Sequence, residues 1–167
     1  MKTIFLVRHA KSSWQNPDLN DDERPLLKKG ENRTKLISKY LKENKIVPEL
    51  LISSHAVRAY ETAKIIAKSI NYPENKIRID KRLYEKGIKG YYNVIDDLQD
   101  EVSSIMLFGH NPTITSFANH FVENIFDYIP TSGIVSFSFE TDKWEEINKV
   151  KSSTNFFITP KQLKINK

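Results

Sequence analysis

Hydrophobic residues in this chain fall into two patterns that alternate along its length. Continuous runs of β-branched, aliphatic and aromatic residues are typical of strands that are buried on both faces of a parallel sheet. Apolar residues three and four positions apart follow these runs and indicate helices with one buried face. The strands predicted in this way are 3–7, 50–52, 77–79 and 105–108. The predicted helices cover 36–41, 56–70, 91–98 and 114–125.

Two polar pairs mark helix starts within this pattern. Ser53-Ser54 precedes the helical segment 56–70 and is expected to supply its N-cap. Asn111-Pro112 precedes the segment 114–125, and it predicts an asparagine cap with proline at the first helical position.

The last third of the chain departs from the alternation. Residues 134–139 alternate apolar and small polar side chains like a strand, and 143–150 is expected to be its antiparallel edge partner. Six lysines and two glutamates lie between Lys143 and Lys167, so this segment carries most of the net charge of +5. We therefore expect a solvated basic tail at about 151–167, with docking to an acidic partner as the alternative.

The order of elements predicts the fold class. A chain of 167 residues is about one domain's worth, and no repeat or low-complexity segment divides it. Strands that alternate with helices predict a single domain over 1–167, built as a three-layer α/β/α sandwich with a mostly parallel central sheet. In such sheets, ligands bind beyond the carboxyl ends of the strands.

Composition narrows the functional classes. The absence of cysteine excludes disulfides, thiolate catalysis and cysteine-bound metals, and it agrees with a cytoplasmic location. The N-terminal apolar stretch ends at Arg8, and no apolar run approaches the ~18 residues that cross a bilayer, so neither an export signal nor membrane binding is expected. The positive charge is concentrated near the C-terminus, so nucleic-acid binding is not expected, and the oligomeric state is not predicted. The acidic cluster 18–23 lacks the spacing of a calcium loop.

Cationic side chains stand at the predicted carboxyl ends of three strands. Arg8-His9 follows the first strand, Arg58 lies in the first turn of the helix after the second, and His110 follows the strand 105–108. Two guanidiniums and two imidazoles around one crevice predict a site for a multiply charged anion, most simply a phosphoryl group. There is no Walker A sequence and no carboxylate pair for magnesium at a strand end, so neither a metal nor another cofactor is expected. A neutral imidazole between arginines is a competent nucleophile toward phosphorus.

Three segments together resemble the motifs of the histidine phosphatase superfamily, branch 1. The segment 6–14, LVRHAKSSW, is similar to its signature segment, and 53–63, SSHAVRAYETA, is similar to its second arginine motif. The segment 109–112, GHNP, is similar to its second histidine motif. The RHAKS wording and the ERPL loop at 23–26 look most like the phosphohistidine phosphatases of the SixA-like branch. The resemblance implies a phosphoglycerate mutase-like fold and a phosphatase with a phosphohistidine enzyme intermediate.

The resemblance also implies roles for individual residues. His9 would be the nucleophile, and Glu85 falls where many members place the general acid. Apart from the resemblance, Gln15 is expected to contribute a hydrogen bond near the phosphate, with a role in loop packing as the alternative. The implied catalytic residues are His9, Glu85 and His110. The expected substrate-binding residues are Arg8, Arg58, His110 and Gln15.

Three functions remain open at this point. A metal-independent phosphatase of protein phosphohistidine is favoured, because a short chain with few insertions leaves the crevice open to a macromolecule. A phosphatase of small phosphate monoesters or nucleotides is the first alternative, and a non-catalytic phosphate-recognition module is the second. Ala10 and Gln15 depart from the glycine and asparagine common in mutase-type members, which argues against phosphoglycerate mutase activity.

Overall fold

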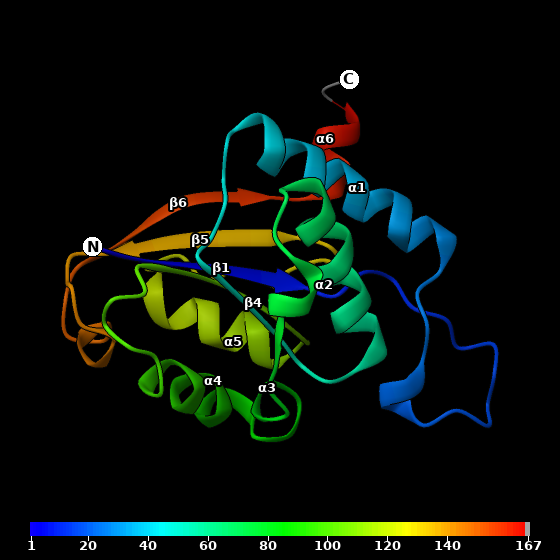
Figure 1. The fold of residues 1–167 in the computed structure, drawn as a ribbon, viewed down its shortest axis with the longest axis horizontal. Coiled ribbons are helices and arrows are strands. Elements are labelled where there is room, and N and C mark those ends of the chain that lie inside the picture. Colours follow the sequence, from blue (N-terminus) through cyan, green and yellow to red (C-terminus); the bar gives the residue numbers. More distant parts are fainter. Residues whose placement is uncertain (166–167) are drawn as a thin grey trace.

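The computed structural model describes residues 1–165, which form one mixed sheet with helices on both faces (Figure 1). The strands lie in the order β3-β2-β4-β1-β5-β6. From β3 to β1 the neighbours are parallel, whereas β5 is antiparallel to β1 and β6 is antiparallel to β5. The strands are β1 (Lys2–Arg8), β2 (Leu50–Ser53), β3 (Arg78–Ile79), β4 (Ser104–Gly109), β5 (Ile134–Phe139) and β6 (Ser152–Ile158).

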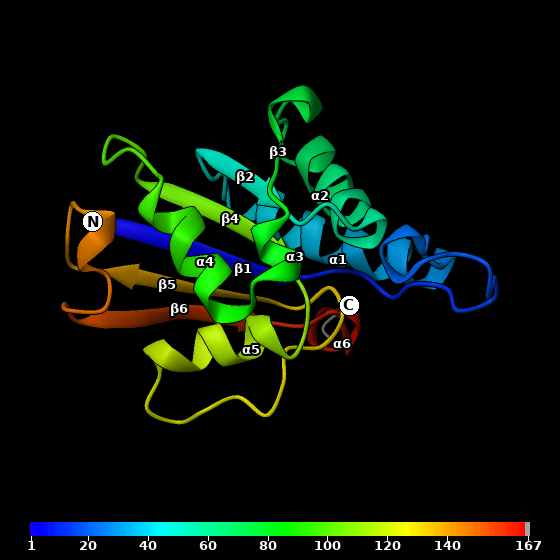
Figure 2. The same ribbon diagram turned by 90° about the horizontal axis from the view of Figure 1, so that it is seen from below.

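Helices cover both faces of the sheet, so the predicted three-layer α/β/α sandwich with a mostly parallel sheet is confirmed (Figures 1 and 2). One face carries α1 (Lys28–Glu43), α2 (Val57–Ser69) and α6 (Pro160–Ile165). The other carries α3 (Arg82–Glu85), α4 (Gly87–Asp96) and α5 (Thr113–Ala118). Within the described residues, no helix has both the length and the apolar composition that crossing a bilayer requires.

Strand β1 is central to both hydrophobic cores. Ile4 and Leu6 pack into the core under α4 and α5, while Phe5 and Val7 pack into the core under α1 and α2. Successive side chains of a strand point to opposite faces, so a strand covered on both faces must be apolar at every position. This requirement explains the continuous apolar run at 4–7 and places the end of β1, at Arg8, between the two helical layers.

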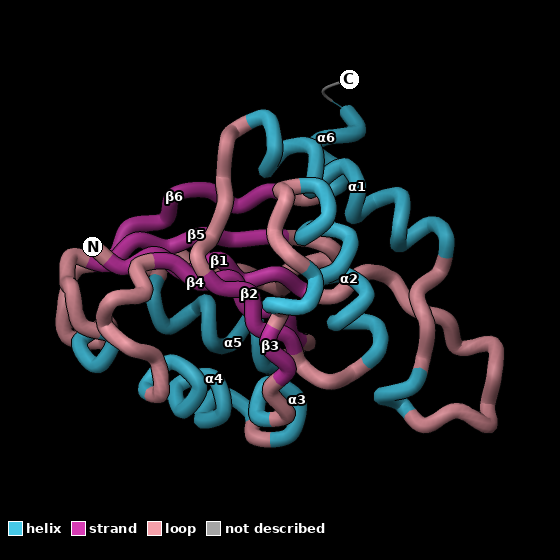
Figure 3. Tube along the Cα trace, viewed as in Figure 1, coloured by secondary structure: helices cyan, strands magenta, loops and turns pink. Residues whose placement is uncertain are grey.

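The first helix begins earlier than its apolar spacing predicts. Helix α1 starts at Lys28, whereas the periodic apolar residues cover only 36–41. The long loop between β1 and α1 returns to the start of this helix (Figure 3), and the Leu27 N–H donates to the Lys11 carbonyl at 3.0 Å. A Cβ on Gly30 would collide with the backbone of Lys11, so the glycine permits this close approach.

The segment around Glu85 is helical. Glu85 is the last residue of α3, and α4 begins at Gly87 and ends at Asp96, so it starts and ends before the predicted range 91–98. A Cβ on Gly90 would collide with the backbone of Arg82, so the glycine lets the first turn of α4 pack against α3.

Both predicted N-caps are one or two residues too early. The N-cap of α2 is Ala56, and the Ser54 hydroxyl accepts a hydrogen bond from the Ala56 N–H at 3.1 Å. The N-cap of α5 is Pro112, not Asn111. The apolar stripe predicted over 114–125 also ends early, because α5 stops at Ala118 and the Ile125 side chain is 70% exposed.

The predicted C-terminal organisation is wrong for the described residues. The segment 143–150 is not a strand; it contains a 3-10 turn at Trp144–Glu146. The edge partner of β5 is β6, and α6 packs on α1, so 152–165 is part of the fold instead of a solvated tail. Phe156 and Phe157 pack on opposite cores, a pattern that the surrounding lysines obscured. Residues 166–167 of the predicted tail lie outside the described residues.

Candidate active site

The two predicted site histidines follow neighbouring parallel strands. Arg8 ends β1 and pairs in register with Gly109, the last residue of β4. The His9 N–H donates to the Gly109 carbonyl at 3.1 Å, and the centroids of the His9 and His110 rings are 5.0 Å apart. The parallel register therefore brings together two residues that are 101 positions apart in the sequence.

The hydrogen bonds of His9 define which ring nitrogen holds a free lone pair. The side chain is buried, and Nδ1 lies 2.8 Å from the Ala10 carbonyl oxygen, which can only accept a hydrogen bond. Nδ1 therefore carries the proton, and Nε2 accepts a hydrogen bond from Arg58 Nε at 3.4 Å. Burial, together with the positive charges of Arg58 and Arg8, lowers the pKa of His9 to about 4. At neutral pH the Nε2 lone pair is consequently available as a nucleophile.

Arg58 connects the nucleophile to the loop after β1. It lies in the first turn of α2 and is 5% exposed. Beside its contact with His9, its Nη1 donates to the Asp21 carbonyl at 2.6 Å and its Nη2 donates to Asp21 Oδ2 at 2.9 Å. Its orientation is thus determined by three contacts, which a planar guanidinium can make at the same time.

Asp21 was not expected in the site, because the acidic cluster 18–23 gives no indication of which carboxylate turns inward. Its Oδ2 accepts a hydrogen bond from the Tyr84 hydroxyl at 2.7 Å, and its Oδ1 accepts one from Arg24 Nε at 3.2 Å. The bond from Tyr84, followed by the contacts with Arg58, lowers the pKa of Asp21 to about 2. Asp21 is therefore a permanent anion at neutral pH.

His110 is held by Ser54, a second residue that the sequence did not identify. Ser54 Oγ lies 2.7 Å from His110 Nε2, within hydrogen-bond distance, and it also accepts the Ala56 N–H at 3.1 Å. Burial, followed by the neighbouring His9 and Arg58, lowers the pKa of His110 to about 3. The ring is therefore neutral at pH 7, and its Nδ1 is buried and has no hydrogen-bond partner within residues 1–165.

Arg8 is anchored by the chain segment that precedes β5. Its Nη1 donates to the Ile129 carbonyl at 3.1 Å, and the backbone N–H of Ser132 donates to the carbonyls of Arg8 and His9 at 3.1 and 3.2 Å. The Arg8 Nε is buried without a hydrogen-bond partner among the described residues. Arg8 Nε and His110 Nδ1 are therefore two buried nitrogens of the site whose hydrogen-bonding capacity is not used among the described residues.

Glu85 and Gln15 lie apart from this cluster of contacts. Both side chains are exposed, and within residues 1–165 neither side chain forms a hydrogen bond or an ion pair. Instead the neighbouring residue Tyr84 contacts the site, with its ring edge-on to His110 at 5.2 Å and its hydroxyl on Asp21. The acid role of Glu85 and the phosphate contact of Gln15 remain predictions.

The arrangement defines a class of protein. A neutral imidazole with a free Nε2 lone pair, surrounded by guanidiniums at the carboxyl end of a parallel sheet, is suited to nucleophilic attack on a phosphoryl group. Among the described residues, no group of three or more histidine, aspartate or glutamate side chains is positioned to hold a metal ion.

Comparison with known proteins identifies the family. Residues 4–92 match the histidine phosphatase superfamily (branch 1), and this chain belongs to that superfamily. The matched range includes His9 and Arg58, whereas His110 lies beyond it. Membership and the site geometry support phosphatase activity. An uncharacterized chloroplastic protein of Arabidopsis thaliana is 30% identical over 118 residues, which are 66% of this chain and 54% of that protein, so the chain spans about half of that relative.

Two solved structures are similar in fold. The SixA protein of Agrobacterium tumefaciens superposes with a TM-score of 0.80 and 24% identity, covering 95% of this chain and 98% of that one. A protein histidine phosphatase SixA in complex with tungstate superposes with a TM-score of 0.81 and 21% identity, covering 96% and 99% of the two chains. The predicted phosphoglycerate mutase-like fold of SixA-type proteins is therefore confirmed.

Proposed function

We propose that this protein is a metal-independent phosphatase that acts on protein phosphohistidine through a phosphohistidine intermediate on His9. The observation that carries the proposal is the hydrogen-bonding of His9. Its Nδ1 proton is held by the Ala10 carbonyl, and its Nε2 faces Arg58, a donor that leaves the imidazole neutral. The site thus holds a nucleophile and a phosphate-binding cation within one hydrogen bond of each other.

The reaction proceeds in two displacements at phosphorus. The His9 Nε2 lone pair forms a P–N bond while the P–N bond to the substrate imidazole breaks, and that imidazole takes a proton from solvent. Water then attacks phosphorus and the bond to His9 breaks, with its electron pair returning to Nε2. One water proton passes to solvent, and hydrogen phosphate leaves with His9 restored. Arg8, Arg58 and His110 bind the phosphoryl oxygens and stabilise the charge that develops on them.

The leaving group favours phosphohistidine over alkyl phosphates. An imidazole has a conjugate acid with a pKa of about 6.5, so it departs without a strongly positioned acid, whereas an alkoxide needs one. Glu85 is exposed and its side chain forms no hydrogen bond or ion pair within residues 1–165, and the Asp21 carboxyl is ionised at neutral pH. A site in which Glu85 is exposed and Asp21 is ionised suits a leaving group that departs without a positioned acid. The SixA structures similar to this one support the same substrate class, and one of them binds tungstate, an oxyanion.

Trapping the phosphorylated enzyme tests the mechanism. The protein is mixed with a histidine-phosphorylated protein labelled with radioactive phosphate, and the reaction is quenched and analysed for label on this chain. We expect label that is stable in alkali and labile in acid, as phosphohistidine is, and that is absent from His9→Ala. Label on His9→Ala, or substrate turnover without label on the wild-type chain, would contradict the role of His9.

A substrate panel separates the alternatives. Turnover of phosphohistidine proteins should exceed turnover of alkyl phosphates and nucleotides, and it should persist in a metal chelator. The reverse preference would support the small-molecule phosphatase, and phosphate binding without turnover of any substrate would support the recognition module. Loss of activity in chelator with recovery on added magnesium would contradict the metal-independent mechanism.

A further inference from the structure

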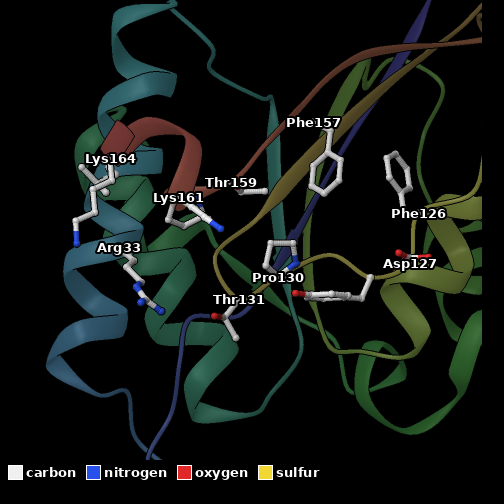
Figure 4. Close-up of a pocket in the computed structure, with 12 residues that line it drawn as sticks. Arg33, Phe126, Asp127, Pro130, Thr131, Phe157, Thr159, Lys161 and Lys164 are labelled. Carbon is white, nitrogen blue, oxygen red and sulfur yellow. The ribbon is translucent and has the colours of Figure 1, made fainter. Parts of the chain in front are cut away.

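A groove of about 720 Å³ lies beside the candidate active site (Figure 4). It is lined by side chains from α1, from the segment 126–131, from the end of β6 and from α6. None of the residues assigned to the active site above lines it. The groove is therefore a separate surface feature of the molecule.

The floor of the groove and the wall of the active site are the same chain segment. Pro130 and Thr131 line the groove. The residues on either side of them contact the site: the Ile129 carbonyl accepts the hydrogen bond from Arg8 Nη1, and the Ser132 N–H donates to the His9 carbonyl. A polypeptide whose phosphohistidine reaches His9 has to cross only this segment to enter the groove.

The groove is basic on one side and aromatic on the other. Figure 4 shows Arg33, Lys161 and Lys164 together, with Phe126 and Phe157 across the groove from them. In the described part of the chain none of these three cations forms an ion pair or a side-chain hydrogen bond. The two phenylalanine rings pack edge-on with centroids 4.7 Å apart, so they form one rigid apolar wall.

The charge balance of the groove indicates the sign of the charge that its partner carries. Asp127 is the one carboxylate in the described lining, against three unpaired cations. Unpaired cations beside an apolar wall favour a partner with both negative and apolar side chains. The negative side chains would pair with the cations at the rim of the groove, while the apolar side chains would be buried against the wall. An acidic polypeptide segment with interspersed apolar residues has this chemistry.

We propose that the groove docks an acidic segment of the phosphohistidine protein, next to the phosphorylated residue. The proposal deepens the proposed function and rests on it. The groove then selects the macromolecular substrate, and the arginine and histidine cluster performs the chemistry that all phosphoryl substrates share.

Charge reversal on α6 tests the docking role. The test variant is Lys161→Glu with Lys164→Glu, because both side chains are exposed. The matched control is Lys149→Glu with Lys151→Glu, which makes the same change in net charge before β6, at the end of the sheet opposite the site. A second test variant, Arg33→Glu, lies on a different helix and keeps the test valid if changes in α6 unfold the chain.

The substrates are two synthetic peptides that carry one phosphohistidine made with phosphoramidate. Glutamates and a leucine flank it in one peptide, and lysines replace the glutamates in the other. We expect the α6 variant to raise KM for the acidic peptide about tenfold with kcat unchanged, since each exposed ion pair contributes about a two- to fivefold factor. Turnover of para-nitrophenyl phosphate should not change, and the control should behave as the wild type does. High salt should abolish the difference between the two peptides.

Separate readouts distinguish failure of the docking site from failure of the proposed function. Absence of phosphohistidine turnover by the wild type would overturn the proposed function. Binding of the fluorescent, unphosphorylated acidic peptide, measured by anisotropy, then decides whether the groove binds acidic polypeptide. The docking proposal is overturned if the α6 variant and Arg33→Glu bind and hydrolyse the acidic peptide as the wild type does. It is equally overturned if the control loses as much, or if a single-stranded oligonucleotide binds the groove more tightly than the peptide.

Discussion

Burial of His9 makes the free energy of unfolding depend on pH. One substitution can isolate the contribution of this residue. In the unfolded chain a histidine has a pKa of about 6.5. In the fold, the pKa of His9 is lowered to about 4 and that of His110 to about 3. Lowering the pH from about 7.5 to about 5 therefore protonates these imidazoles mainly in the unfolded chain. Because the unfolded state then binds more protons, the free energy of unfolding falls as the pH falls.

The magnitude follows from the two sets of pKa values. At about pH 5, each buried imidazole reduces the free energy of unfolding by about 2 kcal/mol relative to about pH 7.5. His9→Asn replaces the imidazole with a polar amide that does not titrate, and it leaves His110 in place. The variant should therefore lose about 2 kcal/mol less than the wild type over this range. The difference depends mainly on the unfolded pKa, because about pH 5 lies above both folded values.

Urea unfolding followed by circular dichroism at each pH measures this difference. His120→Asn is the matched control, because His120 is an exposed histidine outside the site. The control should keep the wild-type pH dependence, since His9 and His110 remain buried in it. Parallel pH dependences for the wild type and His9→Asn would refute the conclusion that the fold holds His9 neutral.

Three substitutions test other contacts of the site by steady-state kinetics. Arg58→Lys should lower kcat/KM for para-nitrophenyl phosphate about 100-fold, because an ammonium cannot contact His9 and both Asp21 oxygens together; near-normal kinetics would place Arg58 outside the reaction. Ser54→Ala should lower kcat about tenfold with little change in KM, since His110 loses the hydroxyl that orients it; an unchanged kcat would show that the ring is held by other contacts. Glu85→Gln should slow alkyl phosphates about tenfold more than phosphohistidine, because an alkoxide needs an acid and an imidazole does not; equal losses would contradict that role for Glu85.

The sequence was sufficient to predict residues whose position follows from a strand end. Arg8 and His9 follow a run that is apolar at every position, and His110 follows another such run. A run of this kind identifies a strand buried on both faces, and parallel pairing then places both strand ends at one edge of the sheet. Arg58 could be predicted for the same reason, because it lies in the first turn of the helix that follows β2.

Residues positioned by tertiary contacts left no such pattern. Asp21 is brought to Arg58 by the path of a long loop, and its partner Tyr84 is 63 residues away in the sequence. Ser54 was interpreted as a helix cap, which is the common role of serine at that position, whereas its hydroxyl also orients a histidine 56 residues away. The local sequence around Asp21 and Ser54 therefore does not determine which distant residues their side chains contact.

The charges of the site also match a phosphoryl dianion. Arg8, Arg24 and Arg58 are cationic and Asp21 is anionic, while His9 and His110 are neutral at pH 7, which leaves a net charge of +2. A phosphate monoester or a phosphohistidine carries close to two negative charges at this pH. Substrate and product phosphate therefore meet the same compensating field. A phosphodiester carries one negative charge, so it leaves one positive charge uncompensated among buried donors. The ionised Asp21 is what sets this balance, because without it the site would carry one more positive charge than a phosphoryl dianion can neutralise.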